Sequence, residues 1–121
     1  MSEEAILVLE DDALIAMDIE MTLAEAGHDK ISVHHKPDTA LEMIEETAPV
    51  AALLDYNLGQ GQTSLAVAEE LRDRGIPFAF LTGYTNSTVP LPEGLGNVKR
   101  IAKPFHAADL VKAIDNMISD E

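Results

Sequence analysis

The sequence contains no cysteine among its 121 residues, which excludes disulfide bonds, thiolate catalysis and sulfur-ligated metals. Aromatic residues make up only 4% of the chain whereas hydrophobic residues make up 46%, so the core must be aliphatic. No apolar run approaches the ~20 residues of a membrane-spanning helix. The acidic start, Met1–Glu4, lacks the basic residues of a secretory signal. These absences predict a cytoplasmic protein.

Basic residues are also scarce, because 8 Lys and Arg stand against 22 Asp and Glu, and the formal net charge is −14. Such a chain repels nucleic-acid phosphates and anionic lipids, so we expect it to bind neither nucleic acid nor membranes. Its length suits one compact domain, and no linker, repeat or low-complexity tract divides it. We therefore expect a single domain over residues 1–121.

Short apolar segments alternate with amphipathic segments along the chain. The predicted strands cover residues 5–9, 31–33, 50–54, 78–81 and 98–102. The predicted helices cover residues 13–26, 37–48, 65–75 and 105–118. This alternation predicts an α/β fold, a doubly wound five-stranded parallel sheet with helices on both faces. Between residues 86 and 97, Pro90, Pro92, Gly94 and Gly96 predict that a fourth helix is short or irregular.

Helical spacing also predicts which side chains enter the core. The expected inward residues are Leu14, Met17, Met21 and Ala24 on the first helix, Leu41, Ile44 and Ala48 on the second, Leu65, Ala68 and Leu71 on the third, and Val111, Ile114 and Met117 on the last. Gly27 and Gly75 are placed to end the helices that precede them. A Gly/Gln loop is expected over Gly59–Gln62.

Charged and polar residues collect where the predicted strands end. These residues are Glu10, Asp11 and Asp12 after the first strand, Asp55 after the third, Thr82 after the fourth and Lys103 just after the fifth. The carboxyl ends of strands carry the functional residues of open α/β sheets, so we expect these side chains to converge.

Their convergence predicts a particular chemistry. Grouped carboxylates repel one another unless a cation lies among them, and a site with only oxygen donors favours Mg²⁺. Asp55 is then positioned as a nucleophile that forms an aspartyl phosphate. The metal and Lys103 would neutralise the phosphoryl charge, and the Thr82 hydroxyl would donate to a phosphoryl oxygen.

Each residue also has a simpler explanation. We favour Asp12 as the N-cap of the following helix and Asp11 as a metal ligand. Asp55 could begin a turn, Lys103 could be a solvated lysine and Thr82 a strand-end cap, but these explanations do not account for the convergence. A surface role is expected for all four histidines, which are His28, His34, His35 and His106.

Four short motifs occur in order along the chain, namely Leu9-Glu10-Asp11-Asp12, Leu53-Leu54-Asp55-Tyr56-Asn57, Leu81-Thr82-Gly83 and Lys103-Pro104-Phe105. With these motifs the sequence resembles the receiver domain of two-component response regulators over essentially its whole length. The resemblance implies the flavodoxin-like (CheY-like) fold with strand order 2-1-3-4-5. It also implies a phosphoacceptor signalling domain, which is not an enzyme beyond its own phosphotransfer and dephosphorylation.

The same resemblance implies a role for each site residue. Asp55 would be the phosphoacceptor, with Mg²⁺ as cofactor. The implied metal ligands are Asp11, Asp55, the backbone carbonyl of Asn57, and Glu10 through water. Thr82 would be the switch hydroxyl and Lys103 the phosphoryl-binding cation. The phosphoryl donor would be a histidine kinase or a phosphotransfer protein, and the domain would be a monomer or weak dimer that signals through protein contacts.

The segment Phe80-Leu81-Thr82-Gly83-Tyr84 resembles a narrower group. It is similar to alphaproteobacterial receivers with a Phe-x-Thr-Gly-Tyr signature, which are often single-domain and associated with HWE-type histidine kinases. Arg100 departs from the family pattern, because it stands where receivers carry a switch aromatic residue.

Two other functions fit parts of the sequence. A pseudo-receiver would only bind a partner protein, but it has no need of the complete acid set and Lys103. An Mg²⁺-dependent phosphohydrolase with an aspartyl nucleophile would need an acid two residues after that nucleophile, where this chain has Asn57.

Overall fold

The computed structural model describes residues 5–59, 62–82, 99–102 and 105–119. Its main sheet contains the parallel strands β1 (Ile6–Leu9), β2 (Ile31–His34), β3 (Ala51–Asp55), β6 (Phe78–Thr82) and β7 (Lys99–Ala102). Their order across the sheet is β2-β1-β3-β6-β7, and every neighbouring pair is parallel. Counted along the chain, these five strands follow the predicted order 2-1-3-4-5, so the predicted topology is confirmed.

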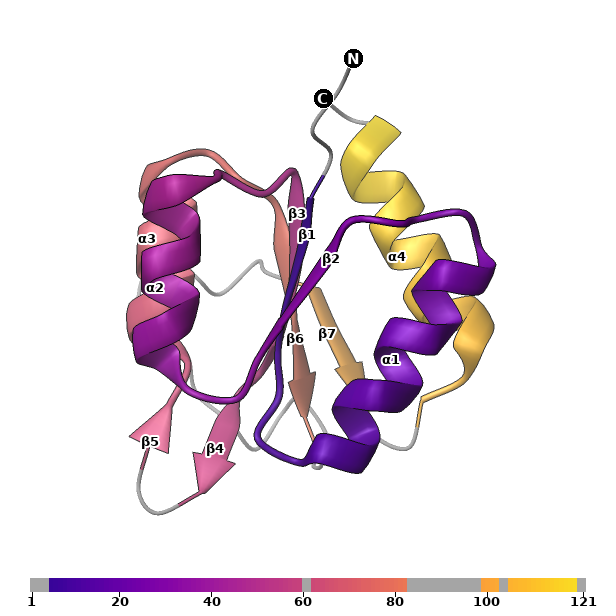
Figure 1. The fold of residues 1–121 in the computed structure, drawn as a ribbon, viewed down its shortest axis with the longest axis horizontal. Helices are drawn as coiled ribbons and strands as arrows, with labels where there is room; N and C mark the ends of the chain where they lie inside the picture. The colour runs from indigo at the N-terminus through magenta and orange to yellow at the C-terminus, as the bar shows by residue number, and fades with distance from the viewer. Residues whose placement is uncertain (1–4, 60–61, 83–98, 103–104, 120–121) are drawn as a thin grey trace.

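Helices cover both faces of this sheet, as Figure 1 shows. They are α1 (Ala13–Glu25), α2 (Pro37–Glu46), α3 (Leu65–Asp73) and α4 (Ala107–Ser119). The helices α1 and α4 pack together over one face, and α2 and α3 over the other. None of the helices in the described ranges is long and apolar enough to cross a membrane.

The central strands are buried on both faces because successive side chains point in opposite directions. In β1, Ile6 and Val8 join the core beneath α1 and α4, whereas Leu7 and Leu9 join the core beneath α2 and α3. All four side chains are fully buried. The continuous apolar runs of the sequence are therefore explained by a sheet that lies between two helical layers.

Local capping sets the helix ends. Gly27 and Gly75 have positive φ angles of 104° and 73°, which favour glycine. After α1, the His28 N–H donates to the Leu23 carbonyl at 3.1 Å and the Gly27 N–H donates to the Ala24 carbonyl at 3.0 Å. This pair of bonds is the Schellman motif, and the predicted helix end at Gly27 is confirmed.

The predicted inward stripe of α1 is wrong. Leu14, Met17 and Met21 are 76%, 53% and 55% exposed, and Ala24 is exposed as well. The buried residues are Ala16, Ile19 and Leu23. Both stripes have the same 3-then-4 spacing, so periodicity alone cannot choose between them. Packing on the sheet makes the choice, because Ile19 and Leu23 join the core cluster that contains Ile6 and Val8 of β1.

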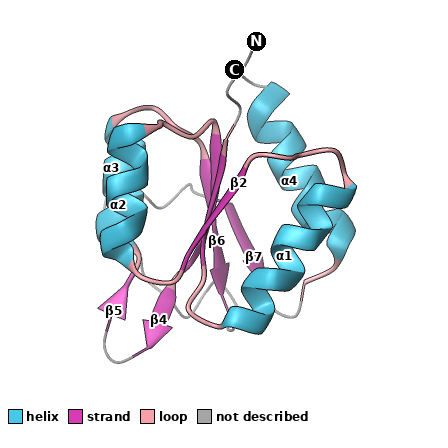
Figure 2. Cartoon of the chain, in the orientation of Figure 1, coloured by secondary structure: helices cyan, strands magenta, loops and turns pink. Residues whose placement is uncertain are grey.

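Other expectations also need correction. Ala48 lies beyond the end of α2 and is exposed, and Leu65 and Val111 are only half-buried. In α4 the core is made by Leu110, Ala113, Ile114 and Met117. The sequence predicts Ile114 and Met117 correctly, but it does not predict Leu110 and Ala113. The two ends of the predicted Gly/Gln loop belong to strands, since Gly59 ends β4 (Asn57–Gly59) and Gln62 begins β5 (Gln62–Thr63), and these strands form the small antiparallel pair visible in Figure 2. Residues 60–61 of that loop lie outside the described residues. The predicted short fourth helix falls within 83–98, outside the described residues.

Candidate functional site

The carboxyl ends of the parallel strands meet at one edge of the sheet, where α1 also begins (Figure 1). The register pairs Leu9 with Leu54, and Asp55 with Leu81, so the residues after β1 and at the end of β3 and β6 are neighbours. The Tyr56 N–H continues the ladder by donating to the Leu81 carbonyl at 2.9 Å. The parallel topology therefore brings together side chains that lie far apart in the sequence.

Three of the predicted carboxylates gather there. Glu10, Asp11 and Asp55 each offer a carboxylate oxygen, and these oxygens lie within 4.8 Å of one another. We call these three residues the acidic rim. Glu10 is fully buried and Asp55 is 5% exposed, whereas Asp11 faces solvent. Two unit charges this close repel by about 1 kcal/mol in water and about 4 kcal/mol at the effective dielectric of a protein surface. A hard divalent cation, which prefers oxygen ligands, would relieve this repulsion.

Glu10 is held in place from several directions. Its backbone N–H donates to the His34 carbonyl at 3.0 Å, and its backbone carbonyl lies 2.9 Å from His35 Nδ1. Its Oε2 accepts a hydrogen bond from the Asp12 N–H at 3.2 Å. The loop after β2 therefore anchors the start of the acidic rim. The sequence gives one signal for this contact, since His35 directly follows β2 and so belongs to the same edge of the sheet.

Asp12 does not belong to the acidic rim. Its Oδ1 accepts hydrogen bonds from the Leu14 N–H at 2.9 Å and the Ile15 N–H at 3.2 Å, which makes it the N-cap of α1. The prediction that Asp12 caps the helix is confirmed. Its side chain satisfies two of the amides that a helix leaves without partners at its N-terminus.

The remaining predicted site residues lie at the same edge or just beyond it. Thr82 ends β6 and is 6% exposed, and Asn57 starts β4 two residues after Asp55. Lys103 follows β7 directly in the sequence and lies outside the described residues. Arg100 is half-buried in the middle of β7.

Three of the four histidines, all expected to have a surface role, make side-chain hydrogen bonds within the described part of the chain. His34 Nε2 lies 2.7 Å from Ser32 Oγ, and His34 Nδ1 lies 2.9 Å from Thr39 Oγ1. The Thr39 hydroxyl donates its proton to the Lys36 carbonyl at 3.3 Å, so it accepts from His34 Nδ1–H, and Nε2 of the neutral ring accepts from Ser32. Burial, followed by the nearby His35, lowers the pKa of His34 below its ordinary value. His28 follows α1, and its Nε2 lies 3.1 Å from Oδ1 of Asp115 in α4.

An aromatic contact supports the strand end that carries Asp55. The rings of Tyr56 and Phe80 meet edge to face with centroids 5.5 Å apart, and Phe80 makes a similar contact with Phe78 at 5.6 Å. Such contacts stabilise a core beyond simple area burial. They fix the backbone beside Asp55 against β6.

Together, a doubly wound sheet and an acidic cluster at the carboxyl ends of its first and third strands define a flavodoxin-like signalling domain. The sequence model of the response regulator receiver domain matches residues 6–115, and the chain belongs to this family. It is therefore a receiver domain of the two-component type. Receiver domains bind Mg²⁺ at an acidic pocket, and the acidic rim provides a cluster of that kind.

Several known proteins are similar to this chain. The phyllosphere-induced regulator PhyR of Methylorubrum extorquens is 33% identical over 119 residues, which cover 93% of this chain and 43% of PhyR. The solution structure of SdrG from Sphingomonas melonis is 34% identical, with a TM-score of 0.79, and covers 98% of this chain and 99% of SdrG. The receiver domain of NtrX from Brucella abortus has a TM-score of 0.83 at 26% identity, covering 96% of this chain and 99% of that domain. The chain spans about half the length of the curated relatives it matches.

Proposed function

We propose that this receiver domain accepts a phosphoryl group on Asp55 in an Mg²⁺-dependent reaction. The observation that carries the proposal is the acidic rim, where the carboxylate oxygens of Asp55, Glu10 and Asp11 lie within 4.8 Å of one another. A buried carboxylate beside two others is an unfavourable arrangement for a purely structural role, because it is held against repulsion. It is a useful arrangement for binding a cation and an incoming phosphoryl group.

The donor set fits Mg²⁺, since it offers only oxygen ligands. Asp11 and Asp55 would hold the ion directly together with the backbone carbonyl of Asn57, and Glu10 would act through water. When bound, Mg²⁺ supplies positive charge that neutralises the phosphoryl oxygens.

In the transfer step, one carboxylate oxygen of Asp55 attacks phosphorus and forms an acyl phosphate. The phosphorus–nitrogen bond of the donor phosphohistidine breaks, and the bonding pair leaves on the imidazole, which takes up a proton. Thr82 directly follows Leu81, the residue that pairs with Asp55 across β3 and β6, and it would donate its hydroxyl to a phosphoryl oxygen. The Lys103 ammonium would balance the remaining negative charge.

We propose a histidine kinase or phosphotransfer protein as the donor, and the Phe80–Tyr84 segment supports a kinase of the HWE type. The exposed stripe of Leu14, Met17 and Met21 supports a docking place for a helix of that donor. The stripe begins three residues after Asp11, so a helix packed on it would bring its histidine to the acidic rim. Leu14→Glu should therefore slow transfer from the kinase and leave labelling by acetyl phosphate unchanged. Equal slowing with both donors would argue against this docking place.

The first experiment is intact mass after incubation with Mg²⁺ and acetyl phosphate. One phosphoryl group should appear on the unaltered chain, and none on Asp55→Asn or without Mg²⁺. Asp12→Asn is the matched control, because it removes a carboxylate beside the rim while keeping a helix-capping side chain. Labelling that persists in Asp55→Asn would rule out the proposal.

If no adduct is found, either the phosphoryl group is short-lived or the chain is a pseudo-receiver. The effect of beryllofluoride on stability separates these two explanations. A Mg²⁺-dependent rise in stability with beryllofluoride would indicate a receiver whose phosphoryl group is short-lived. No rise would favour a pseudo-receiver that only binds a partner. Turnover of p-nitrophenyl phosphate would instead favour a phosphohydrolase, for which Asn57 leaves the general-acid position unfilled.

A further inference from the structure

Strand β2 forms an open edge of the main sheet, because it stands first in the order β2-β1-β3-β6-β7. Figure 1 shows it crossing in front of β1, with α1 and α2 to either side. Its residues are half-buried, whereas those of β1 are buried. The Glu10 N–H donates to the His34 carbonyl at 3.0 Å, so His34 turns its backbone groups toward β1. Backbone groups alternate in direction along a strand, so those of Ile31 and Val33 point away from β1.

The outward backbone groups of Ile31 and Val33 are available to another strand. Among the described residues, no loop or side chain bonds to them. An edge with such groups is a template for an extended segment. The side chains of Ile31 and Val33 pack against the core beneath α1 and α4, whereas Ser32 and His34 lie on the α2 side. The two faces of an added strand would therefore meet different surroundings.

A pocket of about 230 Å³ lies between β2 and α2. Ser32 and His34 line it from β2, and Glu42, Met43 and Glu46 line it from α2 together with two threonines. Glu42 and Glu46 are one helical turn apart and exposed, so their carboxylates repel each other. In the described part of the chain, neither carboxylate pairs with a basic side chain. The pocket beside the open edge is thus suited to a cation.

Other charged groups surround β2. Lys30 precedes the strand and Lys36 follows it, and both side chains are exposed outside the pocket. Helix α2 adds Asp38 and Glu45 to the two carboxylates of the pocket, and it carries no basic residue. A basic segment would therefore be attracted at the centre of β2 and repelled beyond its ends, so the part that binds should be about as long as β2 itself.

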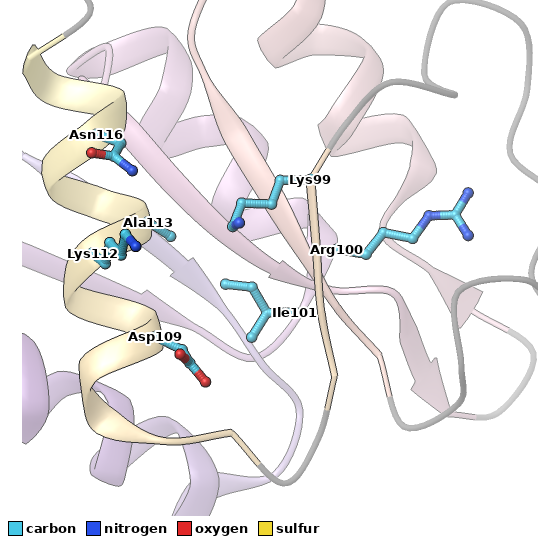
Figure 3. A pocket seen from close by; sticks show the side chains of 7 residues that line it. All are labelled: Lys99, Arg100, Ile101, Asp109, Lys112, Ala113 and Asn116. Atoms are coloured by element: carbon cyan, nitrogen blue, oxygen red, sulfur yellow. The ribbon is translucent and has the colours of Figure 1, made fainter.

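The opposite edge of the sheet has a different charge. The pocket of about 390 Å³ between β7 and α4 is lined by Lys99, Arg100 and Lys112, with Asp109 as its acidic residue. Figure 3 shows that Lys99 points from β7 toward α4, while the Arg100 guanidinium extends to the other side of the strand. Three basic groups against one carboxylate would repel a basic segment. The β2 edge is the one whose charge suits it.

We propose that the open edge of β2 binds an extended basic segment of a partner protein, which adds a strand to the sheet and places a Lys or Arg side chain between Glu42 and Glu46. The backbone of Ile31 and Val33 would form the hydrogen bonds, and Met43 would contact the aliphatic stem of the basic side chain. Because side chains alternate along a strand, the segment should alternate basic and apolar residues, with the apolar ones on the side of Ile31 and Val33.

Charge also selects the occupant. A second copy of the chain would bring its own net charge of −14 to an acidic surface, so the two copies would repel each other. A basic segment is attracted by the same charge. The exposed ion pairs contribute little by themselves, so the backbone pairing has to supply much of the affinity. The proposal does not depend on the proposed phosphoryl transfer, because none of the residues that line the pocket belongs to the acidic rim.

The test is an NMR titration of the ¹⁵N-labelled chain with an acetylated, amidated hexapeptide of alternating Lys and Val. Shifts should concentrate in β2 and α2. The amides of Ile31 and Val33 should exchange with solvent more slowly in the complex, because they become hydrogen-bonded. Two control peptides are an alternating Gln/Val hexapeptide and a block of three Lys followed by three Val, and each should bind at least about fivefold more weakly.

Two variants test the pocket. Glu46→Lys should weaken binding of the Lys/Val peptide about tenfold, because it removes one carboxylate and pairs the other, Glu42, with an ammonium group one turn away. Such a pair is favourable in a helix, so the fold should be retained. Glu69→Lys makes the same change in net charge at an exposed position of α3 outside the pocket, and it should leave binding within about twofold.

Each other outcome overturns the proposal. Equal weakening by Glu69→Lys would show that only net charge matters. Equal binding of the Gln/Val peptide would remove the role of the carboxylates, and equal binding of the block peptide would remove the role of alternation. Unchanged amide exchange at Ile31 and Val33 would exclude strand addition, and shifts concentrated at the acidic rim would place binding there. Shifts in β2 that grow with the concentration of the chain alone would make a second copy the occupant.

Discussion

The imidazole Nδ1 of His35 lies 2.9 Å from the backbone carbonyl oxygen of Glu10. A carbonyl can only accept, so Nδ1 carries the proton and donates. The bond joins the loop after β2 to the first residue of the acidic rim, across 25 positions of sequence. His35 is therefore a positioning residue for the rim, since it acts through the backbone of Glu10 without joining the carboxylate cluster.

His35→Ala should weaken Mg²⁺ binding at the proposed site about fivefold, because one hydrogen bond of about 1 kcal/mol no longer restrains Glu10. The Glu10 amide resonance followed during a Mg²⁺ titration measures this affinity. His35→Gln, which retains an N–H donor, should recover part of the loss. His106→Ala is the matched control at an exposed position. An affinity unchanged in His35→Ala would show that the β2 loop does not restrain the rim.

Asp12→Ala should lower the free energy of unfolding by about 1 kcal/mol, because two α1 amides lose their acceptor. Asp12→Asn should restore most of this stability, since an amide oxygen also caps helices. Urea denaturation followed by circular dichroism provides the measurement. If Asp12→Ala left stability unchanged but abolished Mg²⁺ binding, Asp12 would be a metal ligand and the capping role would be secondary.

Leu23→Ala and Leu14→Ala test the orientation of α1. Leu23 is fully buried, so its truncation should destabilise the fold by about 2–5 kcal/mol. Leu14 is 76% exposed, and its truncation should change stability by no more than about 0.5 kcal/mol. Both variants make the same chemical change in one helix, and thermal or urea unfolding compares them directly. Similar losses for both would mean that α1 packs through the Leu14 stripe.

His34 should make stability depend on pH. Its pKa in the folded protein is lowered from the ordinary value of 6.5, first by burial and then by His35. Below pH 6.5 the unfolded chain therefore binds a proton that the folded chain resists, and protonation favours unfolding. The free energy of unfolding should fall as the pH drops below this value, with no contribution from His34 above it.

His34→Gln should reduce this fall, as measured by urea denaturation at about pH 7.5 and about pH 5.5. The comparison uses the change in the free energy of unfolding between the two pH values, because the substitution also removes the bonds to Ser32 and Thr39 and so lowers stability at both. His106→Gln should keep the full pH dependence of the free energy of unfolding. An identical pH difference in the unaltered chain and His34→Gln would assign the effect to other groups.

Much of this protein follows from local sequence alone. The apolar runs around Leu7 and Leu53 and the strand–helix alternation predict the doubly wound sheet, because a strand buried on both faces must be apolar throughout. Asp12 and Gly27 predict helix ends through bonds to residues two to four positions away. The order of the strand-end acids also predicts the acidic rim, since parallel strands must all end at one edge.

The tertiary structure alone decided the rest. Helix α1 carries two apolar stripes with equal spacing, and only packing on the sheet selects Ile19 and Leu23 over Leu14 and Met17. The bond from His35 to Glu10 joins residues 25 positions apart, and the pocket between Lys99 and Lys112 exists only once β7 lies beside α4. The sequence by itself determined the elements, their caps and the chemistry at the strand ends, because those depend on neighbours along the chain. The rotation of α1, the bond from His35 to Glu10 and the pocket between β7 and α4 required the fold, because they depend on surfaces that meet only after the chain has packed.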